Sequence, residues 1–207
     1  PNYTYASARL LLDELRTEAL TFLDVTGSGG LQTATQAQMT EFYPLALKGF
    51  IDRGVELDLI SPKLQEYDFE QLGAAMRPGH DHLFTYLGLQ TLYDRYFIHW
   101  NETRIELPQV FFMRVAMGLA AEEADANGRA IAFYNLLRSF DYMSSTPTLF
   151  NAGTLRPQLS SCFLTTVPDS LHGIYGAIQD NAMLSKWAGG LGNDWTSVRA
   201  LGSYIKG

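Results

Sequence analysis

The stretch QLSSCFLTTVPDSL, residues 158–171, decides the fold because it changes the chain from a series of helices to a strand followed by a helix. Its first half is rich in Ser, Thr, Phe and Leu, which suits a strand, and Asp169-Ser170 offers an N-cap for a helix over 171–187. Two glycines end that helix, and a second strand is expected over NDWTSVRAL, residues 193–201. This order predicts a parallel pair of strands joined by a crossover.

Outward from this stretch, the preceding residues are predicted to be mainly helical. Residues 1–143 contain segments in which apolar side chains recur every three or four positions, as in PQVFFMRVAMGLA at 108–120. SSTPTLFNAGT, residues 144–154, is short and rich in Thr, Phe and Leu, so we expect strand-like structure there. The sequence therefore predicts a mainly α-helical domain over residues 1–143, followed by a β-α-β unit of an α/β sheet or barrel within residues 144–207.

Composition narrows the class of protein. The 207 residues are 46% hydrophobic and 18% charged, which is typical of a folded chain with a sizeable core. Lys and Arg number 15 against 22 Asp and Glu, and the resulting net charge of −7 argues against a general nucleic-acid-binding surface. The sequence contains neither a run of ~20 apolar residues nor the apolar core of a signal peptide. We therefore expect a cytoplasmic protein without a membrane segment.

The single cysteine, Cys162, cannot form an internal disulfide, so it is an inert buried residue, a reactive thiol, or half of a pair that another chain or another segment completes. Free cysteine is among the most buried residue types, so an inert position on a buried strand is the simpler interpretation. That interpretation predicts that replacing Cys162 by serine changes nothing. One alternative is a reactive thiol, because Ser161 and Cys162 point to opposite faces of a strand near its end, where open α/β folds build their sites.

Two further motifs are weak signals. The glycines of AGGLGND, residues 188–194, either end a helix and form a turn or allow the backbone to approach a ligand closely. This stretch matches neither the dinucleotide-binding G-x-G-x-x-G pattern nor a P-loop. His80 and His82 do not share a helix face and have no cysteine beside them, so we expect no metal site.

Five motifs in the C-terminal part carry a family resemblance. SSTPTLFNAGT, QLSSCFLTT, DSL, AGGLGNDW and VRALGSYIKG, in this order and at this spacing, resemble the catalytic large subunit of an aerobic ribonucleotide reductase. LYDRYF and ELPQVFFMRVAMGLA resemble the helical domain that precedes the barrel of this family. The resemblance covers nearly the whole chain and implies that residues 144–207 begin a ten-stranded α/β barrel.

The resemblance also implies a reaction and residues for it. Cys162 matches the first of two redox cysteines, which reduce the 2′ carbon of a ribonucleotide and end as a disulfide, in a reaction that a thiyl radical starts. In that role the thiol is expected to be buried beside the sugar. Thr146 and Ser161 match positions that hydrogen-bond the ribose or the phosphates. Gly189 and Gly190 match the point where the backbone comes close to the substrate.

Six residues match the allosteric site of the family, which binds a deoxynucleoside triphosphate or ATP as effector. They are Asp169, Ser170 and Leu171 at the start of the site, and Arg199, Ile205 and Lys206 in the loop that covers the effector. Positive side chains beside a triphosphate are electrostatically favourable. The helix after Asp169 packs across a two-fold axis in the family, so a homodimer is expected.

The partners implied by the resemblance are a ribonucleoside diphosphate as substrate, a metal-containing small subunit as radical source, and thioredoxin or glutaredoxin as reductant. No cofactor is expected on this chain itself. An adenosylcobalamin-dependent reductase is a close alternative, and a non-catalytic module that binds a nucleotide or a partner chain is another. The partner redox cysteine, the radical-bearing cysteine and a C-terminal cysteine pair would lie after Gly207. We therefore expect a fragment, or one half of a split subunit, that is inactive alone.

Overall fold

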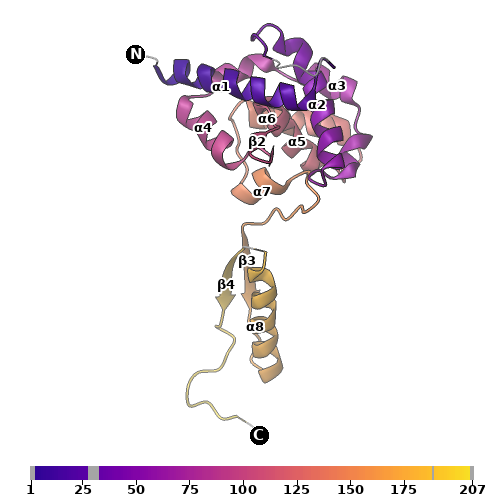
Figure 1. Cartoon of the computed structure of the whole chain (residues 1–207). Coiled ribbons are helices and arrows are strands. Elements are labelled where there is room, and N and C mark those ends of the chain that lie inside the picture. The colour runs from indigo at the N-terminus through magenta and orange to yellow at the C-terminus, as the bar shows by residue number, and fades with distance from the viewer. Residues whose placement is uncertain (1–2, 28–32, 188, 206–207) are drawn as a thin grey trace. The chain divides into compact units, whose positions relative to one another are not determined.

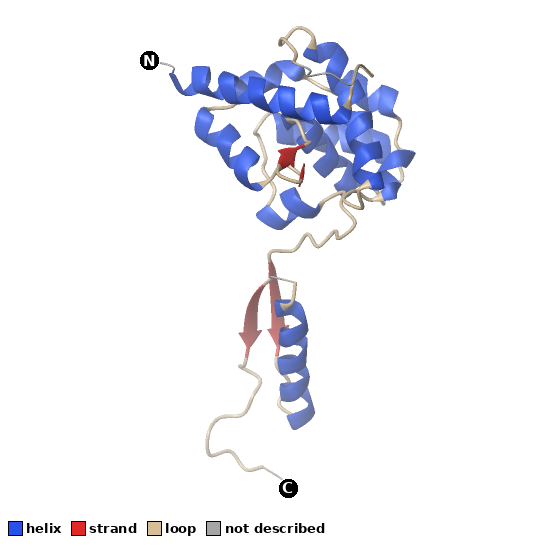
Figure 2. Ribbon diagram, viewed as in Figure 1, coloured by secondary structure: helices blue, strands red, loops and turns tan. Residues whose placement is uncertain are grey.

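In a computed structural model, which describes residues 3–27, 33–187 and 189–205, the chain forms two compact units, Pro1–Pro157 and Gln158–Gly207. The first unit is almost entirely helical, and the second contains a strand, a helix and a strand (Figures 1 and 2). This order confirms the predicted fold class. The domain limit predicted between residues 143 and 144 stays a prediction. Lys206, which is one of the residues predicted for the effector site, lies outside the described residues.

The elements of the first unit are α1 (Tyr3–Leu23), α2 (Met39–Glu56), the 3-10 helix η1 (Pro62–Glu66), α3 (Phe69–Ala75), the 3-10 helix η2 (Pro78–Leu83), α4 (Tyr86–Arg95), β1 (His99–Trp100), β2 (Thr103–Arg104), α5 (Pro108–Ala120), α6 (Ala126–Arg138) and α7 (Thr146–Asn151). The elements of the second unit are β3 (Cys162–Thr166), α8 (Leu171–Ser185) and β4 (Gly190–Asp194).

Helix α5 forms the centre of the first unit. Pro108 starts it, at a position where a missing N–H is tolerated because it would have no partner within the helix. All residues from Val110 to Met117 are buried. A helix that is apolar nearly all round has to be enclosed, and α5 lies in the interior of the unit with α6 packed beside it (Figure 1).

Asp81 in η2 is the centre of a buried polar network in the first unit. Its carboxylate accepts hydrogen bonds from Arg16 Nη2 at 2.9 Å, Tyr43 Oη at 2.7 Å and Gln109 Nε2 at 2.8 Å. Burial raises the pKa of Asp81, and these three partners oppose that shift in part. Burial also raises the pKa of Tyr43 well above its ordinary value. Because the partners come from α1, α2 and α5, the network ties these helices to η2.

Residues 144–154 contradict the prediction of strand-like structure. Residues 146–151 form the short helix α7, with Pro147 in its first turn, and Gly153 lies two residues after it with a φ of +78°. The prediction was wrong because a short apolar run cannot be assigned to a strand or a helix by composition, whereas the proline is a helix-start signal. The backbone after α7 lies directly against α5, since a Cβ on Gly118 would collide with the backbone of Gly153.

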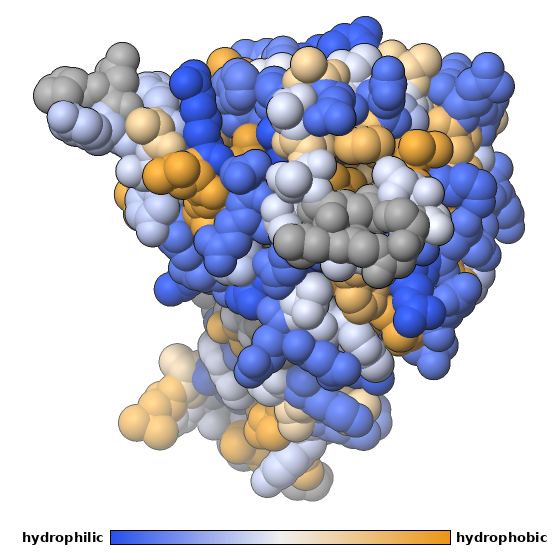
Figure 3. Space-filling model, turned by 45° about the horizontal axis from the view of Figure 1, so that its top comes forward, coloured by the Kyte–Doolittle hydropathy of each residue, from blue (hydrophilic) through white to orange (hydrophobic). Residues whose placement is uncertain are grey.

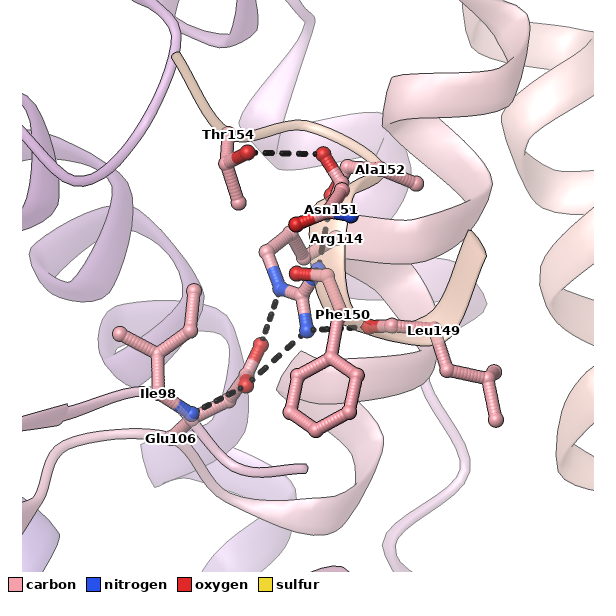
Figure 4. A network of polar contacts seen from close by, with 8 residues as sticks. All are labelled: Ile98, Glu106, Arg114, Leu149, Phe150, Asn151, Ala152 and Thr154. Carbon is pink, nitrogen blue, oxygen red and sulfur yellow. Dashed lines mark hydrogen bonds and ion pairs between the residues drawn. The ribbon is translucent and has the colours of Figure 1, made fainter. Parts of the chain in front are cut away.

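A fully buried ion pair fixes α7 to α5 (Figure 4). The guanidinium of Arg114 meets Glu106 at two points, Nε to Oε1 at 2.6 Å and Nη2 to Oε2 at 3.2 Å. Nη1 also donates to the carbonyl of Ala152 at 2.7 Å, and Nη2 donates to the carbonyl of Leu149 at 3.1 Å. Glu106 Oε2 accepts from the backbone N–H of Ile98 at 3.0 Å. One ion pair therefore satisfies backbone groups at the end of α7 and beside the β1–β2 hairpin.

The second unit is a parallel pair of strands joined by a helix, as predicted. Cys162 of β3 lies opposite Gly190 of β4, and the pairing continues to Thr166 opposite Asp194. The hydroxyl of Ser170 caps α8 by accepting from the N–H of Gly173 at 3.0 Å. The second strand begins before its predicted start at residue 193 and ends at Asp194, so the prediction of strand over residues 195–201 was wrong. The start of this strand was missed because it is rich in glycine, which is uncommon inside strands.

The surface of the first unit is mixed in character. On the face shown in Figure 3, hydrophilic residues predominate and apolar residues are scattered among them. Within the part of the chain that the structure describes, none of the helices combines the length and the apolar character that spanning a membrane would require.

Replacing Arg114 by methionine should lower the free energy of unfolding by about 3–5 kcal/mol, because Glu106 would remain buried without its counter-charge. Urea unfolding followed by circular dichroism measures this difference. The double variant Glu106→Leu/Arg114→Met should be less destabilised than Arg114→Met, since it leaves no uncompensated charge. A loss below about 1 kcal/mol in the single variant would contradict the role of this ion pair, because that is the value of an ordinary exposed pair.

Candidate functional site

The thiol of Cys162 lies beside bare backbone of the neighbouring strand. Cys162 is the first residue of β3 and pairs with Gly190, the first residue of β4. The N–H of Gly190 donates to the carbonyl of Ser161 at 3.0 Å. A Cβ added to Gly190 would lie 3.4 Å from Cys162 Sγ. Three of the predicted site residues are therefore brought together at one end of the strand pair, and glycine leaves the space next to the sulfur open.

Cys162 is exposed, which contradicts the expectation of a buried strand. Exposure alternates along β3, with Cys162, Leu164 and Thr166 exposed and the two residues between them half-buried. Leu164 is 88% exposed, although it is apolar. Among the described residues β3 pairs with β4 alone, and α8 is the helix that contacts both strands. The face of β3 that carries the thiol is therefore open to solvent in this chain.

Gly189 has a different reason to be glycine. A Cβ at this position would collide with the ring of Phe163 on β3. The ring therefore occupies the space that a side chain would need, and the backbone can come close to β3 only without one. The sequence interpretations of these glycines were a helix end with a turn, or close approach to a ligand. At Gly189 the group that the backbone approaches is the neighbouring strand.

Residues predicted for an effector site meet at the start of α8. Arg199 Nε forms an ion pair with Asp169 Oδ2 at 2.8 Å, and Arg199 Nη1 donates to the carbonyl of Tyr204 at 3.2 Å. Leu171 is 75% exposed and Ile205 is 72% exposed, so neither side chain is committed to packing. The segment after β4 therefore returns to the loop between β3 and α8.

The hydroxyl of Ser170 is partly committed in this arrangement. It accepts a hydrogen bond from the N–H of Gly173 as the N-cap of α8. A hydroxyl keeps its own hydrogen when it accepts, so Ser170 can still donate to a ligand.

After β4, Thr196 donates to Asp194 Oδ1 through its backbone N–H at 2.9 Å and its hydroxyl at 2.7 Å, and these bonds lower the pKa of Asp194.

Thr146 belongs to the first unit and the other predicted site residues belong to the second. Thr146 is the first residue of α7, its side chain is exposed, and its hydroxyl lies 3.0 Å from the hydroxyl of Tyr96. The ring of Tyr96 stacks on Phe150, with ring centres 4.8 Å apart.

Comparison with known families gives two matches in chain order. A family model described as "Ribonucleotide reductase, all-alpha domain" matches residues 82–157, and one described as "Ribonucleotide reductase, barrel domain" matches residues 160–207. The chain belongs to the ribonucleotide reductase large-subunit family. The first match covers the second half of the helical unit, and the second covers nearly all of the β3-α8-β4 unit.

Relatives in this reductase family match along all or most of the chain. The "Ribonucleoside-diphosphate reductase subunit alpha" of Chlamydia muridarum is 48% identical over 208 residues, which is 100% of this chain and 19% of that protein. The subunit of the same name from Helicobacter pylori is 39% identical over 209 residues, or 24% of its length. The "Ribonucleoside-diphosphate reductase large chain" of Schizosaccharomyces pombe is 43% identical over 67% of this chain. The chain therefore spans about a fifth of the length of those relatives that match all of its residues.

Sequence reasoning missed two residues of this reductase-family chain that act on the predicted site. Arg114 fixes α7, and Tyr96 contacts Thr146. Arg114 could have been found, because a charged residue inside the apolar run 110–117 is rarely buried unless it is paired, and Glu106 precedes that run. Tyr96 gave no such signal, since its contact depends on how α4 and α7 pack.

No group of three or more His, Cys, Asp or Glu side chains in the described ranges is close enough to hold a metal ion. His80, one of the two histidines considered above, instead hydrogen-bonds the end of α6. Its Nδ1 lies 3.2 Å from the carbonyl of Arg138.

Replacing Gly189 by alanine should destabilise the strand pair by about 1–3 kcal/mol, because the new methyl group must displace the ring of Phe163. Hydrogen exchange of the Gly190 and Val167 amides measures the loss, since both donate within the second unit. Gly176→Ala in α8 is the matched control, because a Cβ there meets nothing within 4 Å. It should leave protection unchanged or increase it. Equal protection in both variants would contradict the packing described for Gly189.

Proposed function

We propose that this chain is part of a ribonucleoside-diphosphate reductase large subunit that converts ribonucleotides to deoxyribonucleotides. The observation that carries the proposal is identity of 39–48% along the whole chain to relatives named as its alpha subunit. The geometry of the only cysteine supports it, because the thiol adjoins glycine backbone instead of a packed core.

The role proposed for Cys162 is that of a redox thiol. The bond between C2′ and its hydroxyl breaks, and a C2′–H bond forms. The hydroxyl leaves as water, and Cys162 and a second thiol together supply two electrons and two hydrogens as they become a disulfide. The second thiol comes from outside these 207 residues, because they contain one cysteine. The radical that starts the reaction also arises elsewhere.

The roles proposed for the other site residues are binding and positioning. Ser161 and Thr146 donate hydrogen bonds to the ribose or the phosphates, and the backbone at Gly189 and Gly190 lies against the substrate. Gly190 supports this role because its missing side chain leaves space beside Cys162 Sγ. Binding groups of this kind orient the substrate and keep water away while the redox thiols act.

An effector nucleotide is proposed to bind at the start of α8. The residues are Asp169, Ser170, Leu171, Arg199, Ile205 and Lys206, and the effector is a deoxynucleoside triphosphate or ATP. The ion pair between Asp169 and Arg199 supports this site, because it holds the segment after β4 beside the start of α8. Exposed apolar residues on α8, including Tyr175 and Ile178, fit the proposed homodimer.

The proposed partners complete the reaction in the cytoplasm. A metal-containing small subunit supplies the radical, and thioredoxin or glutaredoxin reduces the disulfide. The relatives' printed names, "subunit alpha" and "large chain", support a second subunit over adenosylcobalamin as the radical source.

Replacing Cys162 by serine in the complete subunit should reduce the rate of CDP reduction by more than about 1000-fold, because serine cannot donate electrons to the substrate. The assay contains either the small subunit or adenosylcobalamin, and activity with one of them identifies the radical source. Ser160→Ala, at the exposed residue two positions earlier, is the control and should retain full activity. Turnover by Cys162→Ser at the wild-type rate would overturn the redox role and return Cys162 to a structural position.

A further inference from the structure

Helix α7 is held at both ends by side chains from other elements of the first unit. At its C-terminal end, Arg114 donates to the carbonyls of Leu149 and Ala152. At its first residue, Thr146, the hydroxyl lies 3.0 Å from the hydroxyl of Tyr96. A helix of only six residues has little stability of its own, so these contacts determine where its exposed first turn lies.

Tyr96 is itself firmly placed. It follows the last residue of α4, and its backbone N–H donates to the carbonyl of Leu92 at 2.9 Å. Its ring stacks on Phe150, at an interplanar angle of 24°. Thr146 and Phe150 are four residues apart and therefore share one face of α7. Tyr96 lies along that face, with its ring on Phe150 and its hydroxyl at Thr146.

The chemistry of the two hydroxyls fixes which one donates when an anion is bound. A threonine hydroxyl has one hydrogen and two acceptor lone pairs, and a phosphate oxygen only accepts at neutral pH. If Thr146 donates to a phosphate, it has no hydrogen left for Tyr96. The phenol of Tyr96 must then donate to Thr146 Oγ1, which also strengthens the outgoing bond because hydrogen bonds in a chain polarise one another.

We propose that Tyr96 is a positioning residue for nucleotide binding, which donates to Thr146 Oγ1 and so directs the threonine hydrogen toward a phosphate oxygen of the substrate. This inference rests on the proposed function, in which Thr146 binds substrate. Tyr96 acts through Thr146 and does not touch the reacting atoms. The stack on Phe150 holds the phenol in place before the substrate arrives, so little side-chain freedom is lost on binding.

A purely structural role for Tyr96 makes a different prediction. In that case the ring packs against Phe150, and the hydroxyl only adds to the stability of α7. Tyr96→Phe keeps the ring and removes the hydroxyl, so it separates the two roles. A structural role lowers the thermal unfolding midpoint and leaves the KM for substrate unchanged, whereas a positioning role raises KM.

The test uses the complete reductase with its radical source and measures kcat and KM for CDP. Tyr96→Phe should raise KM about 3- to 10-fold with little change in kcat, because a bond to phosphate is present in both the bound substrate and the transition state. Thr146→Val should raise KM at least as much. In the double variant the tyrosine change should add nothing further, since its effect passes through Thr146.

Tyr93→Phe is the matched control. It removes a phenol hydroxyl from α4 that bonds to Glu18 at 3.0 Å, away from α7, and should leave KM for CDP unchanged. A raised KM in Thr146→Val together with a wild-type KM in Tyr96→Phe would overturn this inference and leave the substrate role of Thr146 intact. A wild-type KM in Thr146→Val would overturn that role and the inference with it. Independent, additive effects in the double variant would also overturn the inference.

Discussion

The buried pair of Arg114 and Glu106 is the interaction on which the arrangement of the first unit depends. Removing two charges from water costs several kcal/mol for each ion, and the cost is offset only when geometry and additional hydrogen bonds are good. Here the carboxylate is bound at two points, and the guanidinium also donates to the carbonyls of Leu149 and Ala152. The charges therefore place α7, and α7 presents Thr146 at an exposed position.

In the second unit, glycines allow the close contact between elements that a buried ion pair provides in the first unit. Its parallel strands put Cys162 opposite Gly190, and the missing side chain leaves the sulfur accessible. Gly189 is required for the opposite reason, because the ring of Phe163 already fills its space. A single short glycine run therefore lets the two strands approach closely and leaves the Cys162 thiol uncovered. The ion pair of Asp169 and Arg199 holds the segment after β4 beside the start of α8.

Local sequence signals predicted much of this fold. The apolar periodicity of 108–120 and the N-cap at Ser170 gave the central helix and the start of α8. Residues 144–154 were wrongly predicted because strand and helix compositions overlap in short apolar runs. The second strand was misplaced because glycine is uncommon inside strands. Tyr96 could not be found from sequence, since its contact with Thr146 joins positions that only packing brings together.

In the proposed redox role, Cys162 supplies electrons to the substrate. The most direct measurement is a single turnover of the pre-reduced complete subunit on CDP without external reductant, followed by alkylation and peptide mass spectrometry. The C-terminal cysteine pair implied by the family resemblance is replaced by serine, so that it cannot re-reduce the site. The redox role predicts that deoxycytidine diphosphate forms while Cys162 passes into a disulfide in equal amount. Formation of the product with Cys162 still alkylated as a free thiol would contradict it.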